Sequence, residues 1–508
     1  AQGMEEQNSN VNLLPETGAD TGNYWCTWDT QYRMNTVEDG KNTLNLRDIL
    51  DESFLFGRRG LLNGYFEHIR KDIYVLLDDG WDVPRHIPGN GEISAFGSLI
   101  LNEERFPGFP GAPQERLRKM KERITQLGYR GLGLWICANA AGEAAKEPYS
   151  MEQSREYWKE KALWCQEAGV SYWKVDWGYH AGDSAYRDMM TEVVKQYAPG
   201  VRIEHAICRG PMDETETEAS VLSKVLESSD FFRTYDVTRE FNYSTAIRRA
   251  WEALRLTVNG RHGCECIVNV EDAPYLAAGL GCSMGIMRHP AWGGTKTDVL
   301  DFGRKYNEVE RAVCWQRIAP PFGTGKSRNR ATVKLLRDWT TSIDGPDGEG
   351  WLSHVFDDCE EIEEFAPWMI TRDMDFPAVT SDEKEMPFLV CSKHPQTGAV
   401  SIAFLPRTLG ERKHYTPRTK AAFELKAFTE PIGIFGEFDM LTLSFQEELQ
   451  GRIYLQDLCR DRAHDITEML AQNKRKLVLD FDKIQGKGWL DNDCGDVSAP
   501  GFMICQLG

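Results

Sequence analysis

The feature that most constrains this chain is a repeat along its first ~330 residues. Each repeat has an apolar strand, an acidic or aromatic residue at the strand's end, a loop and an amphipathic helix. Ile73–Leu77 is a continuous apolar run, as is typical of a strand buried on both faces of a parallel sheet. The spacing of Leu117, Met120 and Ile124 predicts a helix that ends at Gly128.

The repeat continues with clear helix signals. Ser150 and Gln153 predict a capping box, and Gly169 is expected to end that helix. A strand over 170–175, a helix over 186–197 and a strand over 201–205 follow. Alternating units of about 30–40 residues imply a parallel sheet, and their number favours a (β/α)8 TIM barrel with its site at the carboxyl ends of the strands. A doubly wound sheet is the alternative, but its G-x-G-x-x-G marker is absent.

The pattern changes after about residue 340. Gly345–Gly350 resembles a linker, and short apolar runs separated by turns come after it. These runs predict an all-β domain, an antiparallel sandwich. We therefore divide the chain into an N-terminal extension (1–22), a (β/α)8 barrel (23–340) and a C-terminal β-sandwich domain (341–508).

Composition narrows the class of partner. The formal net charge of −19 argues against nucleic acid, because proteins that bind phosphate backbones carry basic patches. No apolar stretch is long enough to insert into a membrane. Thirteen cysteines, an odd number without C-x-x-C spacing, do not indicate a disulfide framework.

The compartment is an expectation from the first residues alone. The chain begins at Ala1 without an initiating Met, which is compatible with a removed export signal or with a trimmed chain. We expect an extracytoplasmic location, periplasmic or secreted, with a cytoplasmic one as the alternative. The sequence leaves the oligomeric state open.

Asp176 is the first candidate for chemistry. It follows an apolar strand, and Lys174, two residues earlier, points to the same face. A nearby lysine keeps a carboxylate ionised and therefore nucleophilic. The alternative is a structural Asp–Lys pair at the end of a strand.

Other acidic residues also follow apolar strands. Asp78 and Asp79 stand at the end of 73–77, where neighbouring carboxylates can bind sugar hydroxyls, although Asp-Asp-Gly also suits a simple turn. A third acidic strand end holds Asp230 and Asp236. Splitting a glycosidic bond with retention needs two carboxylates about 5–5.5 Å apart, so several strand ends would have to cooperate.

Five segments, in order, resemble the melibiase-like retaining α-galactosidases, a clan of (β/α)8 enzymes that includes α-N-acetylgalactosaminidases. The resemblance covers roughly residues 23–330. The segments are Asn23–Trp28, Leu77–Trp81, Phe106–Trp135, Trp173–Asp176 and Arg233–Val237. By this resemblance the chain would be an exo-acting glycoside hydrolase with Asp176 as nucleophile and Asp236 as general acid/base.

The resemblance also implies which residues hold the sugar. Asp78, Asp79 and Lys174 would bind hydroxyls, and Arg233 would lie near the acid/base. Glu204 would read the substituent at the 2-position. The aromatic walls of the pocket would come from Trp25, Trp81 and Trp135.

Two departures from the family's pattern affect these assignments. The family places its arginine four residues before the acid/base, whereas Arg233 lies three before Asp236. Some relatives use a Ser-Asp pair, which would nominate Asp230; because Phe231 and the next residue suggest strand, we favour Asp236. The Asp-Pro-Asp motif of the seventh strand has no clean copy, and Asp272 is its nearest candidate.

The sequence gives less support to a metal-dependent reaction or to a serine nucleophile. His180, His205, His262 and His289 show no metal-ligand pairing, so we expect no metal and no cofactor. Gly281–Gly285 spells G-x-S-x-G, but a nucleophile elbow needs a preceding strand and 275–280 suggests a helix.

The expected partner is an oligosaccharide or glycoconjugate. α-Galactose is the family's commonest sugar, and α-N-acetylgalactosamine and β-L-arabinopyranose are alternatives. A transglycosylase would use the same covalent intermediate. A non-catalytic sugar-binding barrel is the alternative from another class, against which the presence of both Asp176 and Asp236 speaks.

Overall fold

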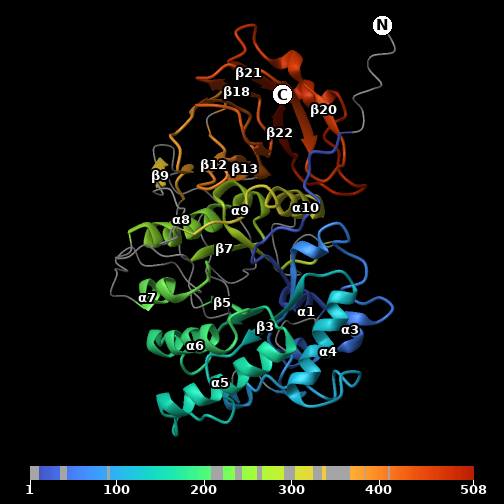
Figure 1. The fold of residues 1–508 in the computed structure, drawn as a ribbon, viewed down its shortest axis with the longest axis vertical. Coiled ribbons are helices and arrows are strands. Elements are labelled where there is room, and N and C mark those ends of the chain that lie inside the picture. Colours follow the sequence, from blue (N-terminus) through green and yellow to red (C-terminus); the bar gives the residue numbers. More distant parts are fainter. Residues whose placement is uncertain are drawn as a thin grey trace.

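A computed structural model describes most of the chain. The described residues are 11–34, 43–87, 92–206, 221–234, 243–259, 266–290, 304–323, 335–338, 366–383, 385–409 and 412–508. Within them, the chain forms a barrel followed by a two-sheet domain (Figure 1).

The first domain is a closed barrel of parallel strands in sequence order, which confirms the (β/α)8 fold over the doubly wound alternative. The last strand closes on the first, with Tyr24 opposite Gly285. The strands are β1 (Tyr24–Cys26), β2 (Tyr74–Leu77), β3 (Gly131–Ile136), β4 (Tyr172–Val175), β5 (Arg202–His205), β6 (Phe231–Arg233), β7 (Ile267–Glu271) and β8 (Ser283–Ile286).

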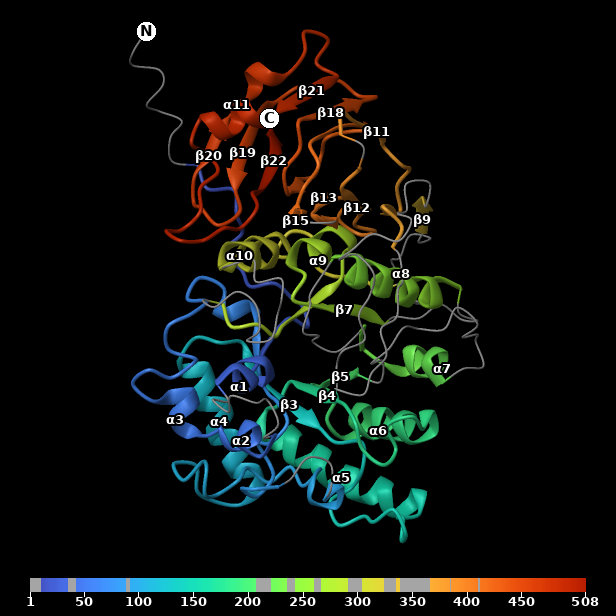
Figure 2. The same cartoon turned by 180° about the vertical axis from the view of Figure 1, so that it is seen from behind.

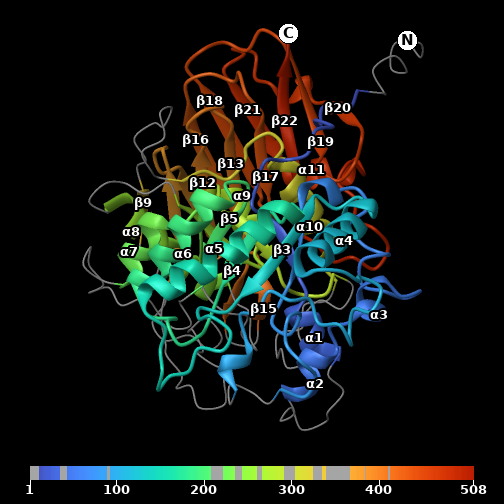
Figure 3. The ribbon, with the colours of Figure 1, turned by 60° about the horizontal axis from the view of Figure 1, so that its bottom comes forward.

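Helices surround these strands on the outside (Figure 3). The α-helices of this domain are α1 (Trp28–Met34), α2 (Thr43–Asp48), α3 (Glu52–Phe56), α4 (Pro113–Gln126), α5 (Met151–Ala168), α6 (Ser184–Tyr197), α7 (Val221–Ser228), α8 (Tyr243–Asn259), α9 (Pro274–Leu280) and α10 (Tyr306–Trp315). Two single 3-10 turns, η1 (Arg70–Asp72) and η2 (Ile93–Ala95), lie in loops.

Helix α5 shows how local sequence sets these elements. Ser150 caps its first turn, and the reciprocal bond from the Gln153 side chain completes the predicted capping box. Gly169 ends the helix with φ of 77°, a left-handed conformation that glycine adopts without steric cost. The helix buries Trp158 and Cys165 against the barrel.

The segment Gly281–Gly285 is a turn into the barrel rather than a nucleophile elbow. It follows helix α9, as predicted, and not a strand. Gly281 caps that helix with φ of 67°, and Ser283 begins β8, where its side chain is fully buried.

The second domain packs an eight-stranded sheet against a four-stranded one. The first has the order β20-β19-β22-β17-β13-β12-β10-β9, and the second β11-β16-β18-β21. The main strands are β9 (Leu335–Asp338), β10 (Met369–Arg372), β11 (Ala378–Ser381), β12 (Phe388–Lys393), β13 (Val400–Leu405), β16 (Thr419–Leu425), β17 (Ile432–Phe435), β18 (Met440–Phe445), β19 (Arg452–Asp457), β20 (Ala463–Asp465), β21 (Lys476–Asp480) and β22 (Gly501–Leu507). A small hairpin, β14 (Arg407–Leu409) with β15 (Arg412–Tyr415), and the short helices η3 (Thr467–Met469) and α11 (Phe481–Gly486) complete the domain.

The expectation of a purely antiparallel sandwich is wrong in one respect, because both sheets are mixed. β10 runs parallel to β12, β13 to β17 and β16 to β18. The chain crosses between the sheets, so neighbours within one sheet are often not consecutive in sequence and need not alternate in direction. The pairing of β9 with β10 also brings the chain into this domain just before residue 340.

The two domains are joined by buried polar contacts. Helices α9 and α10 lie between the barrel and the large sheet (Figure 2). Arg311 of α10 pairs with both carboxylate oxygens of Asp457 on β19, each at 3.0 Å. From the N-terminal extension, the Leu13 amide donates to Gln456 at 2.7 Å, so the extension also contacts the second domain.

Candidate active site

Acidic and basic side chains from several strands meet inside the carboxyl-terminal half of the barrel. Because all eight strands are parallel, the residues that follow β2 and β4 lie at the same rim. Along β4, Lys174 and Asp176 share one face, since alternate residues of a strand point the same way. Both side chains are buried, Asp176 being 7% exposed.

The Asp176 carboxylate has an N–H donor at one oxygen and a guanidinium within ion-pair distance of the other. The indole Nε1 of Trp135, on β3, donates to Oδ2 at 3.0 Å. The guanidinium of Arg233, at the end of β6, lies 3.6 Å from Oδ1. From α6, Arg187 donates to the Asp176 main-chain oxygen at 2.6 Å. A positive charge and an N–H donor both favour the ionised carboxylate that nucleophilic attack requires.

Lys174 pairs with Asp78 rather than with Asp176. Its Nζ lies 2.8 Å from Asp78 Oδ2, and the thiol of Cys26 on β1 donates to the same oxygen at 2.9 Å. Burial alone would favour the neutral amine, but Asp78 and the other acidic groups nearby together outweigh it and raise the pKa of Lys174 above its ordinary value. Lys174 is therefore a fixed cation inside the barrel.

Asp79 forms a second buried ion pair, which the sequence did not suggest. Arg47, on α2, places Nε 2.9 Å from Oδ1 and Nη2 3.0 Å from Oδ2. Burial raises the pKa of Asp79, as do the charges of Asp78 and Asp176, and Arg47 opposes that rise.

Glu204 lies deeper in the barrel than Asp176. It is the strand partner of Lys174, one level below the rim. Its carboxylate accepts hydrogen bonds from Tyr172 at 2.9 Å, from Tyr24 at 3.2 Å and from the Asn269 amide. Burial raises the pKa of Glu204. The structure thus gives this residue a role within the barrel core, and does not bring it to the rim where a 2-substituent would be read.

The three candidate wall tryptophans occupy three different places. Trp135 contacts Asp176, as described above. Trp81 lies behind it and donates from Nε1 to the Trp135 main-chain oxygen at 2.9 Å. Trp25 points out of the barrel, because it alternates with Cys26, and packs edge-on against Phe66 at 5.0 Å. Contrary to expectation, Trp25 therefore faces away from the barrel interior, whereas Trp81 and Trp135 are both fully buried.

Trp177 and Phe96 form an aromatic wall that the sequence reasoning missed. Trp177 follows the nucleophile candidate directly, is half-buried, and lies 5.3 Å from Trp135 between ring centroids. Phe96 packs edge-on against Trp177 at 4.8 Å. An aromatic residue immediately after a rim aspartate was the available signal for Trp177; Phe96 stands in a loop without one.

Of the two acid/base candidates, Asp230 is the one that lies in the described part of the chain. Asp236 lies outside the described residues. Asp230 precedes β6, at the amino end of the strand, where it accepts from the Ile203 amide at 3.0 Å. That end is opposite to the rim, so Asp230 does not approach Asp176.

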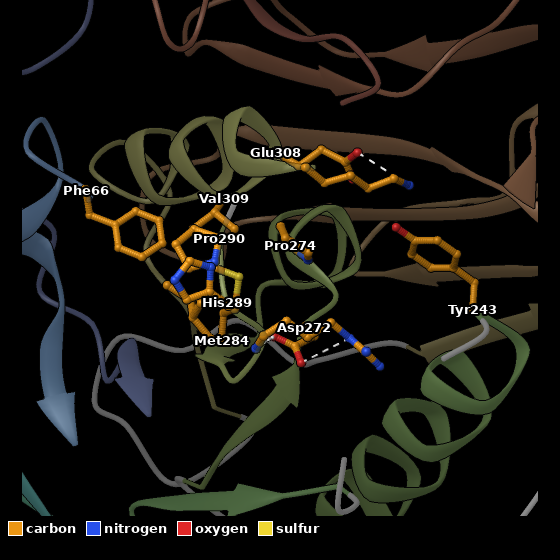
Figure 4. Close-up of a pocket in the computed structure, with 12 residues that line it drawn as sticks. Phe66, Tyr243, Asp272, Pro274, Met284, His289, Pro290, Glu308 and Val309 are labelled. Atoms are coloured by element: carbon orange, nitrogen blue, oxygen red, sulfur yellow. Dashed lines mark hydrogen bonds and ion pairs between the residues drawn. The ribbon is translucent and has the colours of Figure 1, made fainter. Parts of the chain in front are cut away.

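Strand β7 ends in two acidic residues with separate partners. Glu271 lies 2.9 Å from Arg233, inside the barrel. Asp272 turns away and accepts from the amides of Met287 and Arg288, at 2.7 and 3.0 Å. It lines a cavity of about 50 Å³ with His289 and Glu308 (Figure 4). None of Asp78, Asp79, Lys174 or Asp176 lines this cavity.

The candidate metal ligands are dispersed. His180 pairs with the buried Glu143 at 2.8 Å, His205 bonds to Arg187 and Thr191 at 2.9 Å each, and His262 lies outside the described residues. Burial lowers the pKa of His205 well below its ordinary value. In the described part of the chain, no three His, Cys, Asp or Glu side chains form a metal-binding group.

The cysteines within the described ranges are free thiols, most of them buried. No helix among the described residues is long and apolar enough to cross a bilayer.

Comparison with known proteins finds only distant structural similarity. No family model and no curated protein matches the chain. Among solved structures, the chain is similar to a β-L-arabinopyranosidase from Geobacillus stearothermophilus, at 10% identity and a TM-score of 0.41, over 96% of this chain and 97% of that one. An α-amylase from Geobacillus thermoleovorans gives 8% identity and 0.43, over 96% and 99%. A homocysteine methyltransferase from Escherichia coli gives 11% and 0.32, over 53% and 92%.

These values are too low to carry a conclusion about activity. The class that the chain's own strand order defines is a (β/α)8-barrel protein with a C-terminal two-sheet domain.

Proposed function

We propose that this chain is a retaining glycoside hydrolase that acts through a covalent glycosyl-aspartate on Asp176. The observation that carries the proposal is the setting of this carboxylate at the barrel rim, with the Trp135 indole on one oxygen and Arg233 near the other. Lys174 is paired with Asp78, so it supplies fixed charge nearby without neutralising the nucleophile directly.

The reaction would proceed in two displacements. Asp176 attacks the anomeric carbon while a second carboxyl group, assigned to Asp236, protonates the leaving oxygen. The same group then removes a proton from water, which attacks the anomeric carbon and releases Asp176. Arg233 and the Trp135 N–H orient the attacking carboxylate, so that little reorganisation is needed in the transition state.

The finer proposal is an exo-acting, α-galactosidase-like specificity. Its support is the order of sequence motifs, with the paired acids at β2, the lysine and aspartate of β4 and the arginine of β6. A screen of aryl glycosides, with α-galactoside, α-N-acetylgalactosaminide and β-L-arabinopyranoside as the first three, tests it.

The decisive variant is Asp176→Ala. We expect it to lose turnover of an activated aryl glycoside by at least about a thousandfold, because the covalent step is lost. Azide, small enough to enter the vacated space, should restore release of the aryl group and give a glycosyl azide of inverted configuration. Product configuration is read by NMR.

The matched control is Asp20→Ala. Asp20 bridges Arg130 and Arg202 at the amino ends of the strands, at 2.9 and 2.8 Å, so its loss should leave turnover intact and unresponsive to azide. Normal turnover by Asp176→Ala would rule out the proposed function.

A further inference from the structure

Arg47 and Asp79 form a two-point ion pair at the barrel mouth. The two guanidinium nitrogens contact the two carboxylate oxygens at 2.9 and 3.0 Å, and both side chains are buried. Such a two-point contact fixes the plane of the carboxylate as well as its charge. Arg47 comes from α2, outside the regular strand–helix repeat.

The two neighbouring acids differ in how much acceptor capacity remains. Asp78 Oδ2 accepts from both Lys174 and Cys26, and Asp78 Oδ1 accepts from the Asp79 amide at 2.8 Å. Each oxygen of Asp79 accepts one N–H from Arg47. Since a carboxylate oxygen accepts about two hydrogen bonds, donors within the described residues leave Asp79 one position on each oxygen, and Asp78 one in total.

Arg47 is itself held tightly to the β2 loop. Arg105 donates to the main-chain oxygens of Arg47, at 2.8 Å, and of Gly80. Gly80 has φ of 116°, and a Cβ there would lie 2.9 Å from the Cβ of Arg47. A side chain at this position would therefore push Arg47 away from Asp79.

Arg47 also contacts the aromatic wall. Its Cζ lies 4.7 Å from the centroid of Phe96, and Phe96 packs on Trp177, which packs on Trp135. Trp135 in turn donates to Asp176. One side chain thus touches both the acid at the end of β2 and the wall that orients the nucleophile.

The contact between Arg47 and Asp79 affects the pKa of Asp79, because other acidic groups lie nearby. Burial and the neighbouring charges of Asp78 and Asp176 raise the pKa of Asp79, and Arg47 is the charged group that lowers it. Without Arg47, Asp79 would hold its proton to higher pH, and a protonated carboxyl would accept fewer hydroxyl hydrogen bonds.

We propose that Arg47 is a positioning residue, which holds Asp79 as the charged hydroxyl acceptor of the site, while Asp78 serves mainly to position Lys174. This inference rests on the proposed glycosidase function. It gives the two adjacent acids different roles, which the sequence alone does not distinguish. Asp79 binds the substrate, and Asp78 supports Lys174.

Arg47→Ala tests the proposal on an aryl glycoside that the wild type hydrolyses. We expect KM to rise by at least about tenfold, the usual effect of losing a charged hydrogen bond, with kcat changed far less. The acid limb of the kcat/KM profile should move to higher pH, since the pKa of Asp79 rises. Added guanidinium should lower KM towards the wild-type value, and urea, which has the same shape without the charge, should not.

Two further variants separate this role from a merely structural one. In Arg47→Ala/Asp79→Asn the pH shift should vanish, because the titrating group is gone. Arg311→Ala removes an equally buried two-point pair, with Asp457, far from the rim; it should lower stability yet keep the wild-type KM and pH profile. If Arg47→Ala does not fold, Arg47→Lys provides the test. Lysine keeps the positive charge but cannot make the two-point contact with Asp79, so we expect KM to rise about three- to tenfold.

Unchanged KM and pH profile in Arg47→Ala, or in Arg47→Lys where only that variant folds, would overturn the inference. Equal rescue by urea and guanidinium would overturn it too. Failure of the proposed function looks different, because the wild type itself would then hydrolyse no aryl glycoside.

Discussion

At the scale of single residues, depth in the barrel separates two kinds of carboxylate. Glu204 sits one level below the rim and is bonded to tyrosine hydroxyls and an amide. Asp176 sits at the rim, beside a guanidinium and an indole N–H. Glu204 is satisfied within the core by neutral donors, and Arg233 and Lys174 also lower its pKa against the effect of burial. Asp176 is held beside a cation at the rim, where chemistry needs an ionised carboxylate.

The acid/base assignment gives a prediction at this scale. Asp236→Ala should slow hydrolysis of substrates with poor leaving groups by at least about a hundredfold, and of activated aryl glycosides much less, because only the former need protonation. Steady-state kinetics with a series of aryl leaving groups measures this as a steeper dependence on leaving-group pKa. Asp230→Ala is the control, since Asp230 lies at the amino end of β6. The leaving-group effect in Asp230→Ala instead would contradict the assignment.

The sequence identified residues at the ends of the strands, but it did not always predict on which side of the strand each side chain lies. Lys174 and Asp176 lie two positions apart at the end of β4, so the alternation of a strand predicts that they share one face. Trp25 was expected in the pocket, yet its strand is buried on both faces, so the apolar pattern carries no information on which residues point inward. Arg47 was missed because α2 lies outside the repeat.

At the scale of elements, the loop after β2 is tied to a neighbouring loop through one aspartate. Asp82 Oδ2 accepts from the Leu99 amide at 3.1 Å, and the Asp82 main-chain oxygen accepts from the Ser98 hydroxyl at 2.8 Å. The same loop carries Asp78 and Asp79. Burial of Asp82 raises its pKa to about 7, although the Leu99 N–H opposes the rise.

The pKa of Asp82 predicts how stability depends on pH. In the unfolded chain an aspartate has a pKa of about 3.9, so the folded state holds a proton that unfolding releases. The free energy of unfolding should therefore fall as pH rises from about 4 to about 7, by up to about 1.4 kcal/mol per pH unit. Asp82→Asn should remove this part of the slope in urea denaturation.

Glu310 on α10 provides the comparison for Asp82. Burial raises its pKa to about 7 as well, so Glu310→Gln should remove a second, independent part of the slope. The double variant should be flatter than either single one. An unaltered slope in Asp82→Asn would show that this carboxyl titrates normally in the folded protein.

The ends of helices were predictable where the sequence carries local capping signals. Helix α5 begins after Ser150 and ends before Gly169, because a capping box and a left-handed glycine terminate it locally. The order of strands in the second domain was not predictable, since pairing between distant segments leaves no local pattern. The mixed sheets follow from that long-range pairing.

At the scale of the whole molecule, helix α9 is one of the two helices through which the barrel meets the large sheet. The main-chain oxygen of Gly279 accepts from the Ser392 hydroxyl of β12 at 2.7 Å. A Cβ at Gly279 would lie 2.6 Å from Val390 and 2.9 Å from Ala403. Helix and sheet thus approach so closely that only hydrogen fits at this position.

Gly279→Ala should therefore destabilise the protein against the usual trend. Alanine in a helix normally stabilises by about 0.5–1 kcal/mol relative to glycine, but here the added methyl must push Val390, on β12, off the helix, and overpacking costs about 1–3 kcal/mol. The matched control is Gly486→Ala, at the end of α11, where a Cβ meets nothing within 4 Å; it should be neutral or slightly stabilising. Urea denaturation of both variants measures the difference, and a stabilised Gly279→Ala would mean that the two domains are not packed this closely.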